Sequence, residues 1–144
     1  MSELDAPSRA TPTLAVLDWP YARFLGFRAE IDGTVLQALL PFSQHLIGNP
    51  ILPALHGGVV AAFLELTALA QLSLHTPDGR APRTIDTTID YLRSARAQDT
   101  HARAEIIRLG RRVAHVRAIA WQANEAAPVA TMRGHFLLNA PSLG

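Results

Sequence analysis

Four residues between positions 56 and 65 have the types and spacing that could support catalysis: His56, Gly57, Gly58 and Glu65. Glu65 is the single ionisable residue in the nearly apolar run from Val59 to Leu74. A carboxylate in such a run is costly unless it is paired, hydrogen-bonded or protonated. A positioned carboxylate can act as a general base or a nucleophile, and backbone N–H groups at a helix start can stabilise a developing anion.

The apolar run that carries Glu65 predicts a helix from about Gly57 to His75, ended by Pro77-Asp78-Gly79. Its apolar residues surround the helix axis, which indicates burial on most sides. Glu65 follows Gly57 by eight residues, or about 12 Å along the axis. Because that gap is too long for one carbonyl to bridge, an intact site would combine Gly57 of one copy with Glu65 of another.

Structural roles for the same residues stay open at this point. The two glycines could simply allow a tight entry into the helix. Glu65 could be a buried structural carboxylate that is bonded to backbone or to an arginine. His56 could cap the helix or bond a substrate carbonyl.

Composition narrows the functional classes. The chain has 144 residues, which fits one domain, and only 17% are charged, which hints at oligomerisation. A net charge of +1 argues against a nucleic-acid partner held by phosphate contacts. There is no cysteine, so disulfides and thiolate chemistry are excluded. The six histidines lack the spacing of metal ligands, and no metal is expected.

The length of the apolar run and the composition of the N-terminal segment indicate where in the cell the protein is expected. The run is shorter than the ~20 residues that a bilayer span needs, so a buried helix is expected and no membrane contact. Residues 1–13 are polar and have no apolar core, unlike a secretory signal. We therefore expect a flexible arm over 1–13, a single domain over 14–140, and a cytoplasmic protein.

Strands are predicted on both sides of the helix. Asp32-Gly33 predicts a hairpin between Phe24–Ile31 and Thr34–Leu40. After the helix the hydrophobic period changes to two, and the predicted strands are Ile85–Tyr91, His101–Leu109, Arg112–Trp121 and Val129–Leu138. In Arg112–Trp121 one face carries only small residues: Ala114, Val116, Ala118 and Ala120. A face that small is where the helix would lie, so the chain predicts an α+β domain, a long central helix wrapped by an antiparallel sheet.

This element order, with His-Gly-Gly opening the helix, resembles the hotdog fold. More narrowly it resembles the acyl-CoA thioesterases of the phenylacetate-pathway and 4-hydroxybenzoyl-CoA types, in which an acid follows the histidine by nine residues, as Glu65 follows His56. The segments TTIDYLR (Thr87–Arg93), LGRR and ATMRGHFLL also resemble that family, over roughly residues 24–138. The family's amide and glycine positions before His-Gly-Gly are occupied here by Pro50 and Pro53.

The resemblance implies roles for particular residues. Gly57 N–H would stabilise the oxyanion, Glu65 of a neighbouring subunit would act as base or nucleophile, and His56 would be the third catalytic residue. Asn49 and Gly58 would contact the substrate. Arginine forks suit phosphates, so the candidates for coenzyme A are Arg93, Arg108, Arg111 and Arg112, although each could equally lie on a solvated surface. Coenzyme A would enter as part of the substrate, with no separate cofactor.

Three functions follow from this pattern. The first is an acyl-CoA thioesterase that acts on a small aromatic or medium-chain acyl group as a dimer or tetramer. The second is a non-catalytic hotdog module that binds acyl-CoA as a sensor or scaffold. The third, a dehydratase acting on acyl carrier protein thioesters, is disfavoured because neither His45 nor His56 has the required spacing to Glu65.

Overall fold

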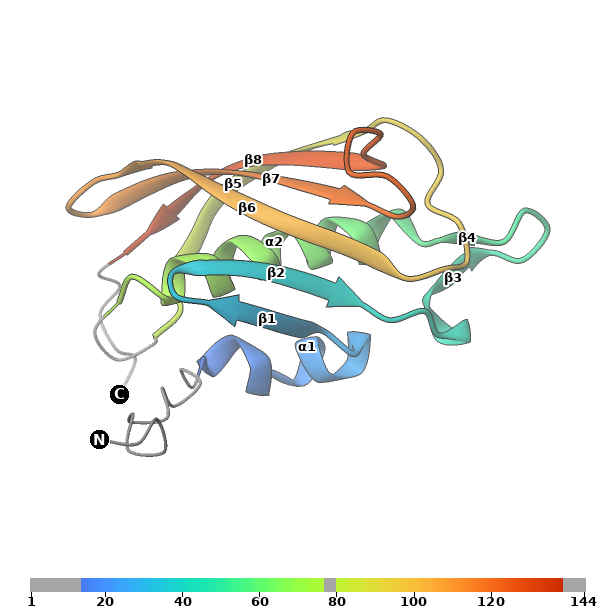
Figure 1. The fold of residues 1–144 in the computed structure, drawn as a ribbon, viewed down its shortest axis with the longest axis horizontal. Helices are drawn as coiled ribbons and strands as arrows, with labels where there is room; N and C mark the ends of the chain where they lie inside the picture. Colours follow the sequence, from blue (N-terminus) through green and yellow to red (C-terminus); the bar gives the residue numbers. More distant parts are fainter. Residues whose placement is uncertain (1–13, 77–79, 139–144) are drawn as a thin grey trace, which may run out of the picture.

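The computed structural model describes residues 14–76 and 80–138. The arm predicted over 1–13 and the last two residues of the predicted domain lie outside the described residues. Within these ranges the chain forms a curved antiparallel sheet around one long helix, α2 (Gly57–Ser73) (Figure 1). The predicted α+β hotdog arrangement, a long helix wrapped by an antiparallel sheet, is confirmed.

The main sheet has six strands in the order β1-β2-β6-β7-β8-β5. Their bounds are β1 (Arg28–Asp32), β2 (Val35–Leu40), β5 (Arg83–Tyr91), β6 (Thr100–Leu109), β7 (Val113–Trp121) and β8 (Ala130–Leu137). All neighbouring pairs are antiparallel. The edges of the sheet are therefore β1 and β5. A separate two-stranded sheet pairs β3 (Ile47–Asn49) with β4 (Ala54–Leu55) directly before α2.

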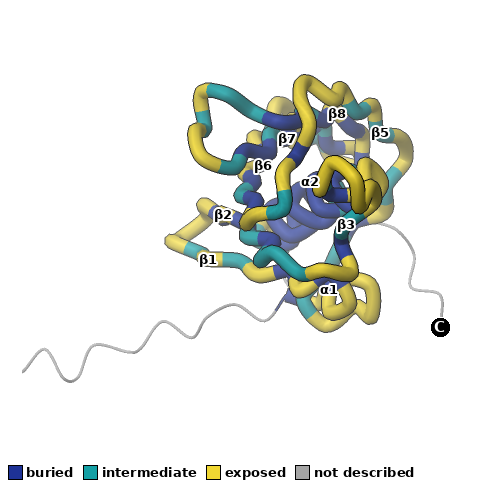
Figure 2. The backbone as a smooth tube through the Cα atoms, turned by 90° about the vertical axis from the view of Figure 1, so that its right-hand side faces the viewer, coloured by how far each residue is buried: buried dark blue, intermediate teal, exposed yellow. Residues whose placement is uncertain are grey.

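Helix α2 packs on the small face of β7, as the sequence predicts. Ala114, Val116, Ala118 and Ala120 are all buried there, so the helix backbone can approach the sheet closely. From Leu66 to Ser73 every residue of the helix is buried (Figure 2). Burial on most sides explains why this helix is nearly apolar all round.

The first strand is shorter than the sequence suggests. Phe24 and Leu25 belong to a short helix, α1 (Pro20–Leu25), which follows a 3₁₀ turn at Ala15–Asp18, so the prediction of a strand from Phe24 is wrong. Pro20 stands at the first helical turn, where its missing N–H costs nothing. Gly26 ends α1 in the left-handed region at φ +80°, which only glycine adopts easily.

Strand β5 departs from simple alternation near its start. The register shifts between Thr84 and Asp86, which leaves Ile85 as the extra residue of a bulge and 54% exposed. Ile85 therefore does not share the buried face with Thr87 and Ile89. The shift turns Thr84 toward α2, where it meets Glu65.

None of the described helices is long and apolar enough to cross a membrane.

Candidate active site

The small β3–β4 sheet positions His56 at the start of α2. The His56 N–H donates to the Leu46 carbonyl at 2.9 Å, and β4 ends at Leu55. Gly48 lies directly across, where a Cβ would stand 2.8 Å from the His56 Cα. Glycine is therefore required at position 48, because any side chain there would push His56 away from the helix start.

His56 caps α2 through its side chain. Its Nδ1 accepts a hydrogen bond from the Gly58 N–H at 2.9 Å, and its carbonyl accepts from Val59 and Val60. Three of the first four N–H groups of the helix therefore have acceptors. The fourth is that of Gly57, and among the described residues none accepts from it. Of the two roles considered for His56, the structure contains the cap.

Tyr91, at the end of β5, completes the surroundings of Gly57. Its hydroxyl donates to the Gly57 carbonyl at 2.8 Å. Its hydroxyl oxygen and the nearest ring carbons lie 3.5–3.6 Å from the point that a Cβ on Gly57 would occupy. The sequence reasoning did not single out Tyr91. A signal was present, because the period of two places Tyr91 on the face of Ile89, toward the helix.

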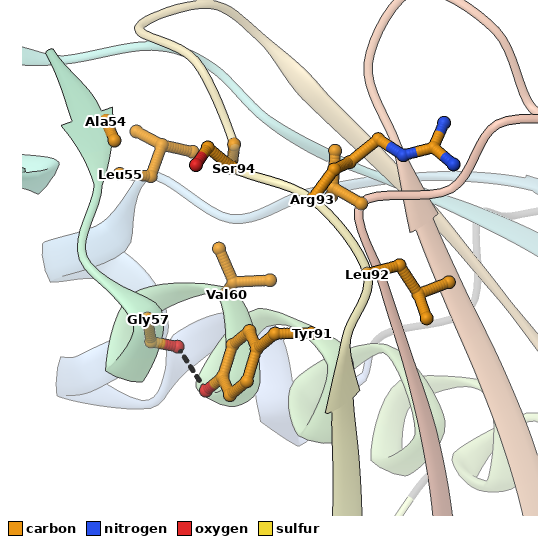
Figure 3. A pocket seen from close by; sticks show the side chains of 10 residues that line it. Ala54, Leu55, Gly57, Val60, Tyr91, Leu92, Arg93 and Ser94 are labelled. Atoms are coloured by element: carbon orange, nitrogen blue, oxygen red, sulfur yellow. Dashed lines mark hydrogen bonds between the residues drawn. The ribbon is translucent and has the colours of Figure 1, made fainter. Parts of the chain in front are cut away.

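A cavity of about 310 Å³ opens beside Gly57 and Tyr91 (Figure 3). Its walls are mostly apolar and include Leu55, Val60, Leu92, Ala95 and Val129. Figure 3 shows the Arg93 side chain at the rim, with its guanidinium directed away from Gly57. The cavity is therefore mostly apolar and has the first residue of α2, Gly57, among its walls.

Glu65 does not line this cavity. Its side chain is half-buried on α2, and Oε1 accepts a hydrogen bond from the Thr84 hydroxyl at 2.7 Å. The structural alternative considered above, a carboxylate held by backbone or arginine, does not describe this contact: the partner is a threonine hydroxyl. In the described part of the chain, Oε2 has no hydrogen-bond partner.

The other arginine candidates lie far from Gly57 within one chain. Arg108 and Arg111 line a second cavity of about 440 Å³ with Gly110, Val113, His115 and His135. This cavity lies at the β6–β7 hairpin, at the opposite end of the sheet from the start of α2 (Figure 1). Arg112 belongs to the same hairpin, and its carbonyl accepts from the Leu138 N–H at 2.7 Å.

The hairpin cavity also contains a pair of histidines. The rings of His115 and His135 stack with centroids 4.8 Å apart, and His135 Nδ1 lies 2.8 Å from a carboxylate oxygen of Asp86. Asp86 offsets part of the positive charge gathered there.

The remaining two candidates have structural contacts. Asn49 Oδ1 accepts from the Ile51 N–H at 3.0 Å and so holds the turn between β3 and β4. Gly58 is exposed, and its N–H is bonded to His56. Neither lines the cavity beside Gly57. The described residues contain no group of three His, Asp or Glu side chains placed to hold a metal ion.

Comparison with solved structures identifies close likenesses in fold. A Chromobacterium violaceum protein is 37% identical, with 88% of this chain and 89% of that one covered and a TM-score of 0.69. A phenylacetic acid degradation-related protein of Ralstonia eutropha JMP134 is 24% identical, with coverages of 83% and 90% and a TM-score of 0.72. A Bacillus halodurans protein solved with CoA is 20% identical, with coverages of 89% and 86% and a TM-score of 0.74.

Comparison at the sequence level agrees with the fold. A search among curated proteins found no match. The model of the Thioesterase superfamily matches residues 52–129, a stretch that holds His56, Gly57, Glu65 and Tyr91 and makes up more than half of the chain. With the hotdog arrangement around α2, this match shows that the chain belongs to the thioesterase superfamily.

Proposed function

We propose that this protein hydrolyses acyl-CoA thioesters in a site formed by two copies of the chain. The observation that carries the proposal is the Gly57 N–H, which has no acceptor among the described residues although it opens a helix beside an apolar cavity. A helix start favours negative charge. A thioester carbonyl in this cavity would direct its oxygen at that N–H, and the donor would stabilise the oxyanion that forms on attack.

Glu65 is the proposed base or nucleophile, and it would come from the second copy. Its Oε1 is bonded to Thr84, whereas Oε2 has no hydrogen-bond partner among the described residues and could meet a water or a carbonyl carbon. As a base, Glu65 would take a proton from the attacking water and return it to the leaving sulfur. As a nucleophile, it would form a mixed anhydride that water then hydrolyses, which regenerates the carboxylate. By either route the C–S bond breaks and coenzyme A leaves as the thiol. Within one chain Glu65 lies about 12 Å along the axis from Gly57 and outside the cavity. A second copy removes this separation.

The uncovered surface of α2 supports such an assembly. After Gly58 the helix positions that are not buried are Ala61, Ala62 and Glu65. They form one stripe with Gly58, and Ala61 lies midway between Gly57 and Glu65. A two-fold axis at Ala61 would place Gly57 of one copy beside Glu65 of the other, because in a two-fold contact each residue meets its counterpart reciprocally.

Strand β5 gives the same position for the axis. Tyr91 bonds Gly57 and Thr84 bonds Glu65, so β5 runs antiparallel to α2 along its uncovered side. The midpoint between Thr84 and Tyr91 lies at Thr87–Thr88, alongside Ala61. Because β5 is an edge strand, it can pair with its counterpart about that axis. Helix and strand therefore agree on one arrangement of two copies.

The cavities suggest how the substrate is held. The apolar walls beside Gly57 suit an uncharged acyl group, and about 310 Å³ has room for a small aromatic or medium-chain acid. The name of the Ralstonia protein relates it to phenylacetic acid degradation, which supports an aromatic acyl group. The hairpin cavity with Arg108 and Arg111 suits the phosphates of coenzyme A, as does Arg93 at the rim of the acyl cavity.

Glu65→Gln tests the proposal most simply. Glutamine keeps the shape and an oxygen for Thr84 but removes the base, so we expect thiol release from acyl-CoA to fall by about 10²–10⁴-fold. Glu105→Gln, an exposed acid on β6, is the matched control and should retain the wild-type rate. Normal hydrolysis by Glu65→Gln would refute this mechanism.

Calorimetry together with the thiol-release assay distinguishes a hydrolase from the alternative, a module that only binds acyl-CoA. A non-catalytic acyl-CoA module would bind the same esters but release no thiol even as the wild-type protein. The assay should cover aromatic, short and long acyl groups, so that a narrow specificity is not mistaken for inactivity.

A further inference from the structure

The peptide unit between Gly57 and Gly58 is held at both of its polar ends. Its carbonyl accepts from the Tyr91 hydroxyl at 2.8 Å. Its N–H, which belongs to Gly58, donates to His56 Nδ1 at 2.9 Å. Figure 3 shows the Tyr91 ring reaching from β5 to the start of α2 to make the first of these bonds. One plane of backbone is thus fixed by two side chains from different elements.

Tyr91 is itself anchored independently of α2. It pairs with Ala130 of β8, and the next residue, Leu92, donates its N–H to the Val129 carbonyl at 2.9 Å. The hydroxyl therefore has a fixed position relative to the sheet although 56% of the residue is exposed. A hydrogen bond from such an anchor ties the helix start to the sheet.

The helix start needs this tie because it consists of two glycines. Glycine loses more conformational freedom on folding than any other residue, and the first turn of a helix has no preceding turn to hold it. The Gly57 N–H belongs to the preceding peptide, whose His56 carbonyl accepts from Val59 and Val60. The two peptides meet at the Gly57 Cα, so a movement of the Gly57 carbonyl away from Tyr91 would displace this Cα and the N–H beside it. A donor helps catalysis only if its direction is set before the reaction.

We propose that Tyr91 is a positioning residue: its hydroxyl bond to the Gly57 carbonyl ties the first residue of α2 to β5 and so holds the Gly57 N–H in place beside the acyl cavity. This inference rests on the proposed function, because it assigns Tyr91 to the oxyanion donor of that site. The ring of Tyr91 is a wall of the cavity, and its hydroxyl is the positioning group.

Tyr91→Phe separates the role of the hydroxyl from that of the ring, because it keeps the ring as a cavity wall and removes only the hydroxyl. We expect kcat for thiol release to fall about tenfold, the size of one hydrogen bond in the transition state, while KM stays within about twofold. Amide hydrogen exchange at Gly58 should become several times faster, since one end of its peptide is freed. Tyr21→Phe, an exposed tyrosine on α1, is the control and should change neither quantity.

The outcomes separate this inference from the proposed function. An active wild-type protein with an unchanged kcat and unchanged Gly58 exchange in Tyr91→Phe would overturn the positioning role and leave the function intact. A rise in KM with an unchanged kcat would also overturn it, because the hydroxyl would then act on substrate affinity. A wild-type protein that releases no thiol would overturn the proposed function itself.

Discussion

The two ring nitrogens of His56 differ: Nδ1 makes a structural contact, whereas Nε2 has no hydrogen-bond partner among the described residues. Nδ1 accepts from the Gly58 N–H, so in the neutral ring the proton is on Nε2. The cap satisfies a donor that would otherwise be open at the helix start. It also leaves Gly57 as the first-turn N–H without an acceptor among the described residues. The cap thus leaves the Gly57 N–H as the available backbone donor at the helix start, beside the cavity.

Replacing His56 by asparagine or by alanine distinguishes capping from contact with substrate. Asparagine is among the best N-caps, and its Oδ1 can accept from Gly58 in place of Nδ1. We expect His56→Asn to keep kcat within about threefold and His56→Ala to lose about 1 kcal/mol of unfolding free energy. Urea unfolding and thiol release measure these quantities. A fall in the kcat of His56→Asn as deep as that of Glu65→Gln would instead assign Nε2 to the substrate.

For individual residues, the sequence indicates which side chains belong to the candidate site better than it indicates what they contact. The lone acid in an apolar run and the glycines at its start were enough to select Glu65 and Gly57, because both are anomalies within a local pattern. Tyr91 and Thr84 were not selected, because their roles arise from β5 lying beside α2. The bulge that turns Thr84 toward Glu65 has no local signature that pattern reading detects.

Helix α2 is fixed to the first hairpin by a buried amide. Gln71 Nε2 donates to the Thr34 carbonyl at 2.6 Å, and its Oε1 accepts from the Leu36 N–H at 3.0 Å. Both partners belong to the hairpin of β1 and β2, where Gly33 makes the turn at φ +64°. This side chain ties α2 to the hairpin at the sheet edge farther from β5.

Gln71→Ala should therefore destabilise the fold strongly. The change leaves a buried N–H without an acceptor and opens a gap, and we expect a loss of about 2–4 kcal/mol in unfolding free energy. Gln37→Ala, an exposed glutamine on β2, is the control and should cost about 0.5 kcal/mol or less. Equal losses in urea unfolding would mean that the Gln71 contacts contribute little.

The elements themselves could mostly be predicted from the sequence. Helix α2 gave its signal as a long apolar run, because it is buried on most sides, and the small face of β7 gave its signal as strict alternation, because that face is buried along the strand. The short helix α1 was missed because six residues carry too little periodicity, and its real signals are Pro20 at the start and Gly26 at the end. Its exposed aromatic residue Phe24 also favoured a strand by propensity.

At the scale of the molecule, the side along β5 is incompletely covered by the described residues. Strand β5 is an edge of the sheet, and along it lies the uncovered stripe of α2 that contains Ala61, Ala62 and Glu65. Exposed apolar residues continue along that edge at Ile85 and Tyr91. An open edge beside apolar surface favours association with another chain. The low charge fraction of the sequence agrees with this expectation.

Two variants disable the two halves of the proposed site with little structural change. Gly57→Pro removes the N–H donor, and proline is accepted at the first helical position. His56 has φ −60° and ψ 133°, a conformation compatible with a following proline. Gly57→Ala keeps the N–H and serves as its control, because a Cβ there would make ordinary contacts with Tyr91. Glu65→Gln disables the other half.

Mixing these variants measures whether the site spans two chains. Each variant alone lacks a required group in both sites of its dimer. A mixed dimer would hold one site with Gly57 from the Glu65→Gln chain and Glu65 from the Gly57→Pro chain. Co-refolding the two at equal amounts should therefore restore thiol release to about a quarter of the wild-type rate, from random pairing in a two-fold dimer. A mixture that stays at the residual rate of its parents would contradict a site shared between copies.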